Sequence, residues 1–326
     1  MADRIRDVGG GANHYPTLSA WEAGEQADLV ALDERRIAHC YNFSDTTPVV
    51  LAGWTTDATR YAYITVPSGQ RHDGKWSTSG YRLEITSGTG IDVQIRDALI
   101  EYIQISIQEN GATQRFGIHV SATATGQVIN VEKCILRQHP SSSGSGNLRG
   151  VRLNTTGTIR VSNTLFIDWR QGSGSGFSRS AGTGYIYNCG AHNCNIGIGA
   201  GSGPVTAINS WAQNCTDGFQ GSYAAASSNN LSDIATDAPG TGPITGDISF
   251  VDEANDDFHL AAGDTLAKDA GINLSADANY PISGDIDGQA RSGTWDIGPD
   301  EYVVVASGGS FPPLGRRRKL RRLFHH

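Results

Sequence analysis

The chain consists largely of short apolar runs separated by clusters of small and polar residues. Runs rich in Val, Ile, Leu and Tyr alternate with clusters of Gly, Ser, Thr and Asn along most of the sequence. Such short runs, bounded by turn-forming residues, are typical of β-strands and not of helices. β-Branched residues favour strands because their side chains fit a pleated, half-buried surface. The pattern therefore predicts an all-β chain with many tight turns.

Four of these runs can be aligned with one another as members of a repeat. They cover Val131–Ile135, Val161–Leu165, Tyr187–Ala191 and Ile208–Ala212. Their first residues are separated by 30, 26 and 21 positions. A recurring unit of this size that contains short strands is typical of arrays in which each unit stacks on the next.

Two further sequence tracks follow the same spacing. A glycine precedes an apolar residue at Gly117-Ile118, Gly150-Val151, Gly176-Phe177, Gly197-Ile198 and Gly218-Phe219. The pairs Asn193-Cys194 and Asn214-Cys215 are 21 residues apart, as are the last two members of the glycine track. Shared spacing in separate tracks indicates stacked coils. It predicts amide ladders at the turns, one joining Asn188 to Asn209 and one joining Asn193 to Asn214.

This repeat resembles that of the right-handed parallel β-helix proteins, over roughly residues 81 to 235. That family includes polysaccharide lyases, glycosidases and phage tail spikes. The resemblance implies an all-β solenoid in which each coil contributes two or three short parallel strands and buries its apolar face against the next coil. It identifies a fold better than a function, because one fold hosts many functions.

Both ends of the predicted solenoid are expected to be caps, because terminal coils expose unpaired strand edges. Residues 1–80 form the expected N-terminal cap, with one or two short amphipathic helices between Tyr15 and Cys40. Residues 236–305 form the expected C-terminal cap, and the series from Asp257 to Tyr302 resembles the terminal segment of bacterial surface β-helix proteins. Residues 306–326 are predicted to be a linker followed by a basic tail.

The composition excludes several classes of protein. Gly accounts for 41 of 326 residues and only 18% of residues are charged, which disfavours helical bundles and coiled coils. No apolar stretch is long enough to predict membrane insertion. The N-terminus lacks a secretory signal pattern, so we expect a trimmed signal or release by another route such as lysis. The five cysteines lack zinc-ligand spacing and are predicted to be buried thiols and not disulfides: Cys40, Cys134, Cys189, Cys194 and Cys215.

The basic tail is the clearest candidate for a contact with a partner. It holds six of the 25 Lys and Arg residues, which leaves 19 basic against 33 acidic residues in the preceding body, a net charge of −14. A cationic tail on an acidic body could attach it to other virion or surface-assembly proteins. The predicted partner-binding residues are Arg316, Arg317, Arg318, Lys319, Arg321, Arg322 and Phe324.

A second candidate contact is a site for an acidic glycan. Asp168, Trp169 and Arg170 are consecutive, and Arg149, Arg152 and Arg160 are expected within about one coil of them. The predicted glycan-binding residues are Arg152, Arg160, Asp168, Trp169 and Arg170. An aromatic platform flanked by arginines and a carboxylate suits an acidic sugar.

No catalytic residue, metal ligand or cofactor is predicted. The outward positions aligned across the coils are predicted to hold Asn130, Arg160, Ile186 and Ala207, which contain no acidic ladder of the kind that a glycosidase needs. Lys133 and Arg152 are candidate bases for a lyase, but no acidic calcium cluster accompanies them. The stretch Asp285–Gly288 is interpreted as a structural turn, because Trp295 stands where a calcium loop places its closing Glu.

Two classes of function remain open. We expect a non-enzymatic structural or adhesive protein of a phage-like virion or an extracellular surface, such as a head decoration protein, spike or fibre. A homo-oligomer, most simply a homotrimer, suits a rigid rod of this kind. The alternative is a secreted polysaccharide lyase, glycoside hydrolase or glycan-binding module. A groove lined by two facing carboxylates would favour an enzyme, and a tail buried in a neighbouring subunit would favour a structural role.

Overall fold

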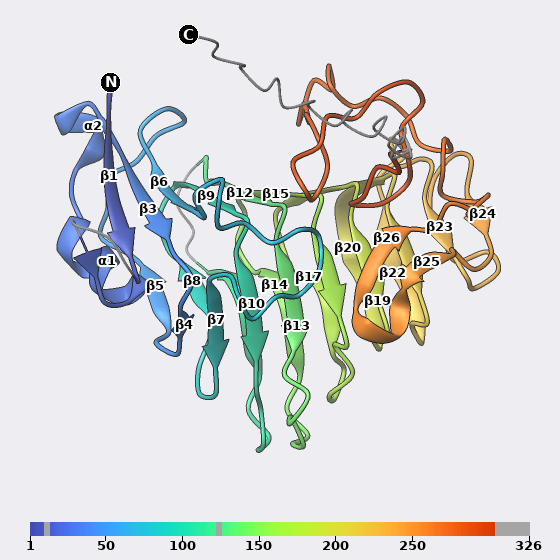
Figure 1. The fold of residues 1–326 in the computed structure, drawn as a ribbon, viewed down its shortest axis with the longest axis horizontal. Coiled ribbons are helices and arrows are strands. Elements are labelled where there is room, and N and C mark those ends of the chain that lie inside the picture. The colour runs from blue at the N-terminus through green and yellow to red at the C-terminus, as the bar shows by residue number, and fades with distance from the viewer. Residues whose placement is uncertain (10–13, 122–125, 304–326) are drawn as a thin grey trace, which may run out of the picture.

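The fold is given by a computed structural model that describes residues 1–9, 14–121 and 126–303 (Figure 1). Parallel strands dominate this part of the chain, in one sheet of fifteen strands and one of nine. Two short helices lie near the N-terminus. The prediction of an all-β chain is confirmed. No helix among the described residues has the length and apolarity needed to cross a membrane.

The strands form three strips that enclose one core, which we name from their positions in Figure 1. The upper strip contains β1 (Ala2–Val8), β2 (His14–Tyr15), β3 (Glu34–Cys40), β6 (Ala62–Thr65), β9 (Asp97–Glu101), β12 (Val128–Glu132), β15 (Thr158–Ser162), β18 (Thr183–Tyr187) and the second half of β20 (Ile196–Ile208). The front strip contains β4 (Ser44–Asp45), β7 (Arg82–Ile85), β10 (Gln104–Ile107), β13 (Ile135–Gln138), β16 (Leu165–Ile167), β19 (Gly190–His192), β21 (Trp211–Gln213), β23 (Leu231–Ser232) and β24 (Ile244–Thr245). The rear strip contains β5 (Val49–Leu51), β8 (Ile91–Val93), β11 (Arg115–Val120), β14 (Leu148–Leu153), β17 (Ser175–Arg179), the first half of β20 and β22 (Asp217–Tyr223).

The chain visits the strips in a fixed order: upper, front, rear, and then upper again. For example, β9 is followed by β10 and β11, and β12 then pairs in parallel with β9. The long strand β20 pairs with β17 through its first half and with β18 through its second half. It therefore joins the upper and rear strips into the fifteen-stranded sheet. We call each such passage through the three strips a circuit.

In successive circuits, the tight turn from the upper to the front strip contains a residue whose backbone has the left-handed conformation. The residues at this turn, with their φ angles, are Tyr102 (59°), Lys133 (50°), Asn163 (46°), Asn188 (51°) and Asn209 (51°). Asn tolerates this conformation better than most residues with a side chain. The amide of Asn209 donates to Oδ1 of Asn188 at 3.0 Å, which confirms the first predicted ladder. The second predicted ladder is not formed.

At the second predicted ladder, the asparagine side chains bond to carboxylates instead of to each other. Asn193 donates to Oδ1 of Asp168, and Asn214 donates to Oε1 of Glu253 at 2.7 Å. A carboxylate accepts a stronger hydrogen bond than an amide oxygen does, so these pairings are preferred where a carboxylate is within reach.

The predicted alignment of the repeat is wrong by one residue at its centre. Ser162 pairs with Tyr187, so the middle offset is 25 and not 26, because Asn163 and Asn188 occupy equivalent turns. A slip of one residue exchanges the two faces of a strand. Ile186 and Ala207, expected to point outward, are therefore fully buried. The outward row instead continues from Asn130 and Arg160 through Tyr185 and Thr206.

The glycine track is confirmed throughout its length. Residues that follow these glycines pair in register on the rear strip: Ile118 with Val151, Val151 with Phe177, Phe177 with Ile198, and Ile198 with Phe219. Each glycine faces the carbonyl oxygen of the glycine in the next circuit. A Cβ atom at Gly117, Gly150, Gly176 or Gly197 would lie only 2.5 to 2.7 Å from that oxygen. The track exists because no side chain fits there.

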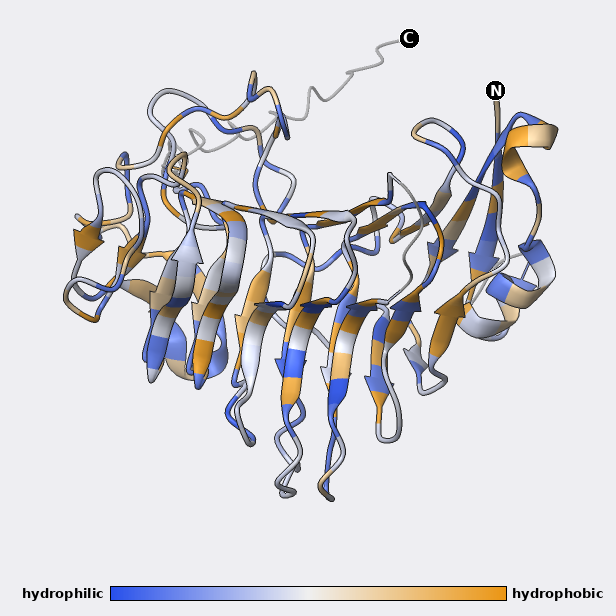
Figure 2. Cartoon of the chain, turned by 180° about the vertical axis from the view of Figure 1, so that it is seen from behind, coloured by the Kyte–Doolittle hydropathy of each residue, from blue (hydrophilic) through white to orange (hydrophobic). Residues whose placement is uncertain are grey.

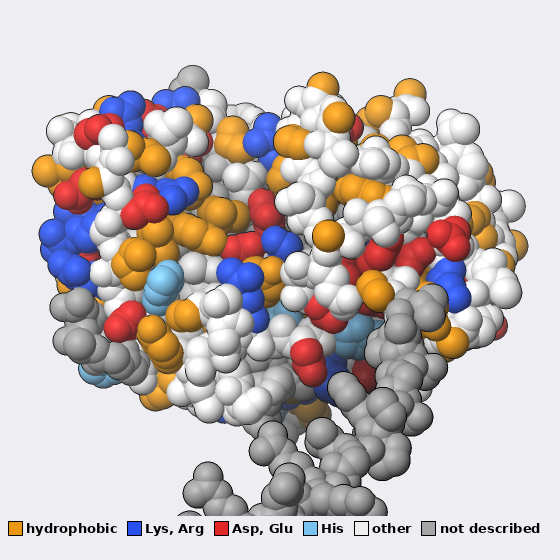
Figure 3. Space-filling model, turned by 45° about the horizontal axis from the view of Figure 1, so that its top comes forward, with side chains coloured by type: hydrophobic (Ala, Val, Ile, Leu, Met, Phe, Trp, Pro, Cys, Tyr) orange, Lys and Arg blue, Asp and Glu red, His pale blue; other side chains and the backbone are white. Residues whose placement is uncertain are grey.

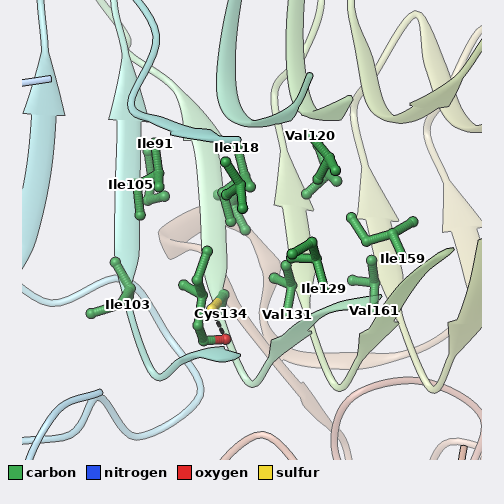
Figure 4. Packing of buried hydrophobic residues seen from close by; sticks show 14 of the residues in the cluster. Ile91, Ile103, Ile105, Ile118, Val120, Ile129, Val131, Cys134, Ile159 and Val161 are labelled. Atoms are coloured by element: carbon green, nitrogen blue, oxygen red, sulfur yellow. Dashed lines mark hydrogen bonds between the residues drawn. The ribbon is translucent and has the colours of Figure 1, made fainter. Parts of the chain in front are cut away.

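Aliphatic side chains from all three strips fill the space between them (Figure 4). Ile91, Ile118 and Val151 form one continuous row, and each of these side chains is fully buried. Burial of one such side chain contributes about 1.5–3 kcal/mol to folding. The five cysteines are free and buried, as predicted.

The N-terminal residues contain the two short helices expected there. Helix α1 (Leu18–Glu25) begins after Thr17, whose hydroxyl accepts a hydrogen bond from the Ala20 amide at 3.1 Å. Helix α2 (Leu29–Leu32) leads into β3. The Trp21 ring of α1 packs against Trp54, with the ring centroids 5.4 Å apart.

A C-terminal segment, residues 246–303, packs on the outer face of the front strip. It contains β25 (Phe250–Asp252), the 3-10 turn η1 (Glu253–Asn255) and β26 (Asp257–Leu260), and the two strands are antiparallel. Trp211 of the front strip points into it, with its ring centroid 5.0 Å from Phe250 and 6.0 Å from Phe258. In Figure 1 the last part of this segment rises above the upper strip.

Candidate functional site

The five residues predicted to form one glycan site lie in three places. Arg152 is on the rear strip, Arg160 is on the upper strip, and Asp168–Arg170 follow β16. Trp169 is fully buried and its indole Nε1 donates to the carbonyl of Leu136 at 3.1 Å. A buried ring cannot stack on a sugar, so the expected aromatic platform is absent at Trp169. Arg170 donates to the side chain of Asn193 at 2.9 Å.

The predicted partner-binding residues of the basic tail lie outside the described residues. They are Arg316, Arg317, Arg318, Lys319, Arg321, Arg322 and Phe324.

Three arginines line a pocket of about 320 Å³ on the rear strip, which we call the arginine pocket. Arg149 and Arg152 come from β14 and Arg179 comes from the end of β17. The remaining residues that line it are Ser173, Ser175, Ser178, Ile196, Gly199, Gly201 and Gln220. Figure 2 turns this side of the molecule toward the viewer, and hydrophilic stretches interrupt the strands there.

The register of the strands explains why the surface is hollow at this place. Arg149 pairs with Ser175, and Arg152 pairs with Ser178, which in turn pairs with Gly199. Side-chain size therefore falls sharply from one strand to the next along each outward row. The long arginine side chains form one wall, and the small residues of β17 and β20 form the floor.

The three guanidinium groups lack carboxylate partners among the residues that the structure describes. Burial lowers the pKa of all three, and the neighbouring charge of Arg152 lowers that of Arg149 further. Nε of Arg149 is buried without a hydrogen-bond acceptor. Arginine stays charged in proteins, so the pocket concentrates uncompensated positive charge.

An aromatic pair flanks the arginine pocket on the next strand. Phe116 pairs with Arg149 and His119 pairs with Arg152, and the two rings stack with their centroids 4.4 Å apart. Nδ1 of His119 lies 3.3 Å from a carboxylate oxygen of Asp92. The pocket therefore offers cations, hydroxyl groups and an aromatic surface together, which is a combination suited to acidic sugars.

The sequence placed Arg149 and Arg152 near the predicted glycan site, of which only Arg152 was predicted as a site residue, and it did not indicate Arg179, Phe116 or His119. The glycine track was the signal that could have joined Phe116 to Arg149. Because Gly150 aligns with Gly117, the residue before each glycine, Arg149 or Phe116, must share one outward row. Arg179 pairs with the buried Leu153 at the end of β17, so alternation along the strand predicts an inward side chain and not a place in the pocket.

Two carboxylates do lie on adjacent circuits, contrary to the expectation from sequence. Glu101 and Glu132 pair directly on the upper strip. Burial raises the pKa of Glu132. Glu101 is already occupied, since it accepts hydrogen bonds from the hydroxyl of Tyr63 and from Nζ of Lys133 at 2.9 Å. Neither carboxylate lines the arginine pocket.

Lys133, a candidate lyase base, carries a proton in this setting. Burial acts to lower its pKa, but the carboxylate of Glu101 outweighs burial, so the pKa is raised. A protonated ammonium group cannot accept a proton. Burial lowers the pKa of Arg152, the other candidate base, but arginine stays charged in proteins, so Arg152 is not a better base.

A histidine with carboxylate neighbours lies in the C-terminal segment. Nδ1 of His259 is 2.5 Å from Asp257, and Nε2 is 3.2 Å from Asp287. Asp300 lies close enough for His259, Asp287 and Asp300 to hold one cation together. The hydrogen bond to Asp287, aided by that to Asp257, raises the pKa of His259 to about 10 against the opposing effect of burial. A cation would therefore have to displace the imidazole proton.

We expect the C-terminal segment to lose stability as the pH rises, through His259. An unfolded histidine titrates near pH 6.5, so its folded pKa of about 10 stabilises the fold fully below pH 6.5. That contribution is lost as the pH rises toward 10. Burial raises the pKa of Asp285 to about 7 and that of Asp296 to about 6, so both groups lose their protons at lower pH than His259 does.

Thermal unfolding between about pH 7.5 and 9.5 measures this dependence. The wild-type protein should lose more stability over this range than His259→Gln does. His14→Gln, at an exposed position, serves as the matched control and should behave like wild type. Identical slopes for wild type and His259→Gln would contradict the expectation.

No protein-family profile matches this chain, and no curated protein sequence is significantly similar to it.

Proposed function

We propose that this chain is a non-enzymatic, adhesive β-helix protein that binds acidic polysaccharide through the arginine pocket. The observation that carries the proposal is the group of three arginines, Arg149, Arg152 and Arg179, with no carboxylate partner among the described residues. Arg152 donates to the hydroxyl groups of Ser178 and Ser180, and Arg179 donates to the carbonyl oxygens of Gly182 and Ala200, but none of these partners carries a negative charge. Partly buried cations gathered without a neutralising charge cost stability, so a group of them is expected where an anion binds.

The proposed architecture is a right-handed parallel β-helix with a cap at each end. It is supported by the parallel pairing of strands from successive circuits and by the left-handed turn between the upper and front strips. The helices α1 and α2 lie at one end of the strips, where a cap would block edge-to-edge pairing, and the C-terminal segment packs along the front strip (Figure 1). Such a body is rigid and presents a long row of outward side chains.

The chemistry of the pocket favours carboxylate or sulfate groups on a sugar polymer. A guanidinium group binds such groups through two parallel hydrogen bonds. Ser175 and Ser178 offer hydroxyl groups beside the arginines, and Phe116 offers a ring on which a sugar could stack. The rows continue over several strands, so more than one sugar unit of a polymer could be in contact.

Binding of polygalacturonate, with neutral dextran as the comparison, tests the proposal. We expect the wild-type protein to bind polygalacturonate, less tightly as the salt concentration rises, and not to bind dextran. Arg149→Met and Arg152→Met should each weaken binding about tenfold, as the loss of a charged hydrogen bond implies. Arg170→Met, which removes an exposed arginine outside the pocket, is the matched control and should bind normally. Equal binding of dextran, or full binding of polygalacturonate by a variant that carries both Arg149→Met and Arg152→Met, would refute the proposal.

A polysaccharide lyase is the second candidate, because the guanidinium groups of Arg149 and Arg152 could neutralise the carboxylate of an acidic sugar, as a lyase requires. The same mixtures distinguish the two functions. Unsaturated, shortened polygalacturonate would indicate a lyase, whereas an intact polymer is expected for an adhesive protein.

The proposed location on a virion or an extracellular surface rests on charge. The six basic residues of the tail oppose a body of net charge −14, which supports attachment of the body to a larger assembly through the tail. We propose a homo-oligomer, most simply a trimer, as the attached form.

A further inference from the structure

A second pocket lies on the upper strip, away from the arginine pocket. It has a volume of about 280 Å³ and is lined by three strands, β9, β12 and β15, together with the loop before β6. Asp97, Asn130 and Arg160 provide its polar groups, and Tyr61, Ala58, Ala98 and Val128 provide the rest of its lining. We call it the upper pocket. Figure 3 brings the upper strip into view, with acidic and basic side chains gathered between the two ends of the molecule.

Three polar atoms of the upper pocket are buried without a hydrogen-bond partner among the described residues. They are Oδ2 of Asp97, Oδ1 of Asn130 and Nε of Arg160. Asp97 is only 5% exposed, and Nε of Arg96 lies 3.4 Å from its Oδ2 without making a hydrogen bond. Unpaired buried polar groups are rare in folded proteins, and three around one pocket indicate that a ligand supplies the partners.

The register of the strands sets the arrangement of these groups. Asn130 pairs directly with Arg160, and Asp97 pairs with Val128, two residues before Asn130 on the same strand. Residues two apart on a strand point to the same face, so all three side chains lie on the outer face of the upper strip. Two hydrogen-bond acceptors and one cationic donor therefore surround one small space.

The mixture of charges selects the kind of ligand. A plain anion would meet the carboxylate of Asp97 and would leave Oδ1 of Asn130 without a donor. A plain cation would be repelled by Arg160 and by Arg96 beside Asp97. A hydroxyl group can both donate and accept, so neighbouring hydroxyl groups on a sugar ring can satisfy all three atoms. The ring of Tyr61 and the side chain of Val128 offer apolar contact to the C–H face of such a ring.

We propose that the upper pocket binds a single neutral sugar ring through Asp97, Asn130 and Arg160. Its volume is at the small end of ligand pockets, which suits one ring and not a chain of several. The arginine pocket is on another strip, and its charged lining residues are all cationic. The upper pocket is therefore a separate site with its own ligand, and it does not depend on the binding of acidic polysaccharide.

Saturation-transfer NMR on the full chain, with ligands at millimolar concentration, tests this site. The probes are the methyl glycosides of glucose, galactose and mannose, together with galacturonate, inorganic phosphate and glycine. We expect at least one neutral glycoside to bind. Asn130→Leu and Arg160→Met should each weaken that binding about tenfold, because each removes a hydrogen bond and leaves its partner unpaired.

Two control variants separate this site from its surroundings. Tyr185→Phe alters the neighbour of Arg160 in the same outward row but not the pocket lining, and it should bind the glycoside normally. Arg149→Met should also bind the glycoside normally, even though it is expected to lose polygalacturonate. Binding of only galacturonate, phosphate or glycine would overturn the proposal, as would the absence of binding by every neutral glycoside. Glycoside binding that survives both Asn130→Leu and Arg160→Met would place the ligand elsewhere and would also overturn it.

Discussion

Gly150→Ala is expected to abolish stable folding or to lower the free energy of unfolding severely. The added Cβ would lie 2.5 Å from the carbonyl oxygen of Gly176 and 2.8 Å from Cδ1 of Phe166. The oxygen belongs to the paired backbone of the next circuit and cannot move without breaking the parallel ladder. Overpacking of a core commonly costs about 1–3 kcal/mol, and a clash with the backbone places this variant at or above the upper end. Chemical denaturation of the purified variant measures the loss.

Two other glycines provide a graded control for this substitution. At Gly199, on the same strip, the nearest atom to an added Cβ is a carbonyl oxygen 3.2 Å away, so Gly199→Ala should be milder. At Gly69 nothing lies within 4 Å of the added atom, so Gly69→Ala should leave stability nearly unchanged. Equal stability of all three variants would show that the glycine track does not hold the circuits at their close spacing.

The sequence predicted the parts of the fold that repeat. The glycine track placed the rear strip in register without error, because only glycine fits where one circuit approaches the next. The asparagine at the turn was also found, since Asn adopts the left-handed conformation readily. The alignment slipped by one residue between Asn163 and Asn188, where apolar residues were matched and the turn residues were not. Because of that single slip, Ile186 and Ala207 were predicted to point outward, whereas both are buried.

The candidate sites were harder to predict, because residues that pair across the strands around the arginine pocket are 21 to 33 positions apart in the chain. Asp168, Trp169 and Arg170 are adjacent in sequence and so suggested a site, yet Trp169 points into the core. Arg149 and Phe116 are far apart in sequence but adjacent in the fold. The arginine pocket is hollow because Ser178 and Gly199 are small, and small residues in a sequence do not by themselves indicate a binding site.

Trp211 attaches the C-terminal segment to the outer face of the front strip. Trp211 lies beside Gly190 on the neighbouring strand, and a Cβ atom there would overlap the indole ring. The ring then packs against Phe250 and Phe258 of the C-terminal segment. The sequence alignment placed Trp211 among the stacked positions but did not predict whether its side chain points into the core or outward. Its true role is to join the segment to the strip, and the same segment is joined to the upper turn by one buried arginine.

Arg291→Met is expected to release much of the C-terminal segment from the parallel strips. The Arg291 side chain is fully buried and donates to the carbonyl oxygens of Gly298 at 2.7 Å and Pro299 at 2.9 Å. It also donates to Oδ1 of Asn163, the residue at the turn between β15 and β16, at 3.1 Å. Glu301 lies 3.1 Å from Nη1 and balances its charge.

Methionine keeps an unbranched apolar side chain in place of the aliphatic part of arginine but supplies no donor, so Arg291→Met leaves Glu301 and several carbonyl oxygens buried and unpaired. Removal of one partner of a buried ion pair costs about 3–5 kcal/mol. Because these contacts lie within the C-terminal segment and at one turn, limited proteolysis should cut the segment while the strips stay intact. Arg170→Met, at an exposed position, is the matched control and should resist proteolysis like wild type. Unchanged proteolysis and unchanged thermal unfolding of Arg291→Met would contradict the role assigned to this side chain, whereas a single cooperative loss of all structure would mean that the strips themselves depend on the segment.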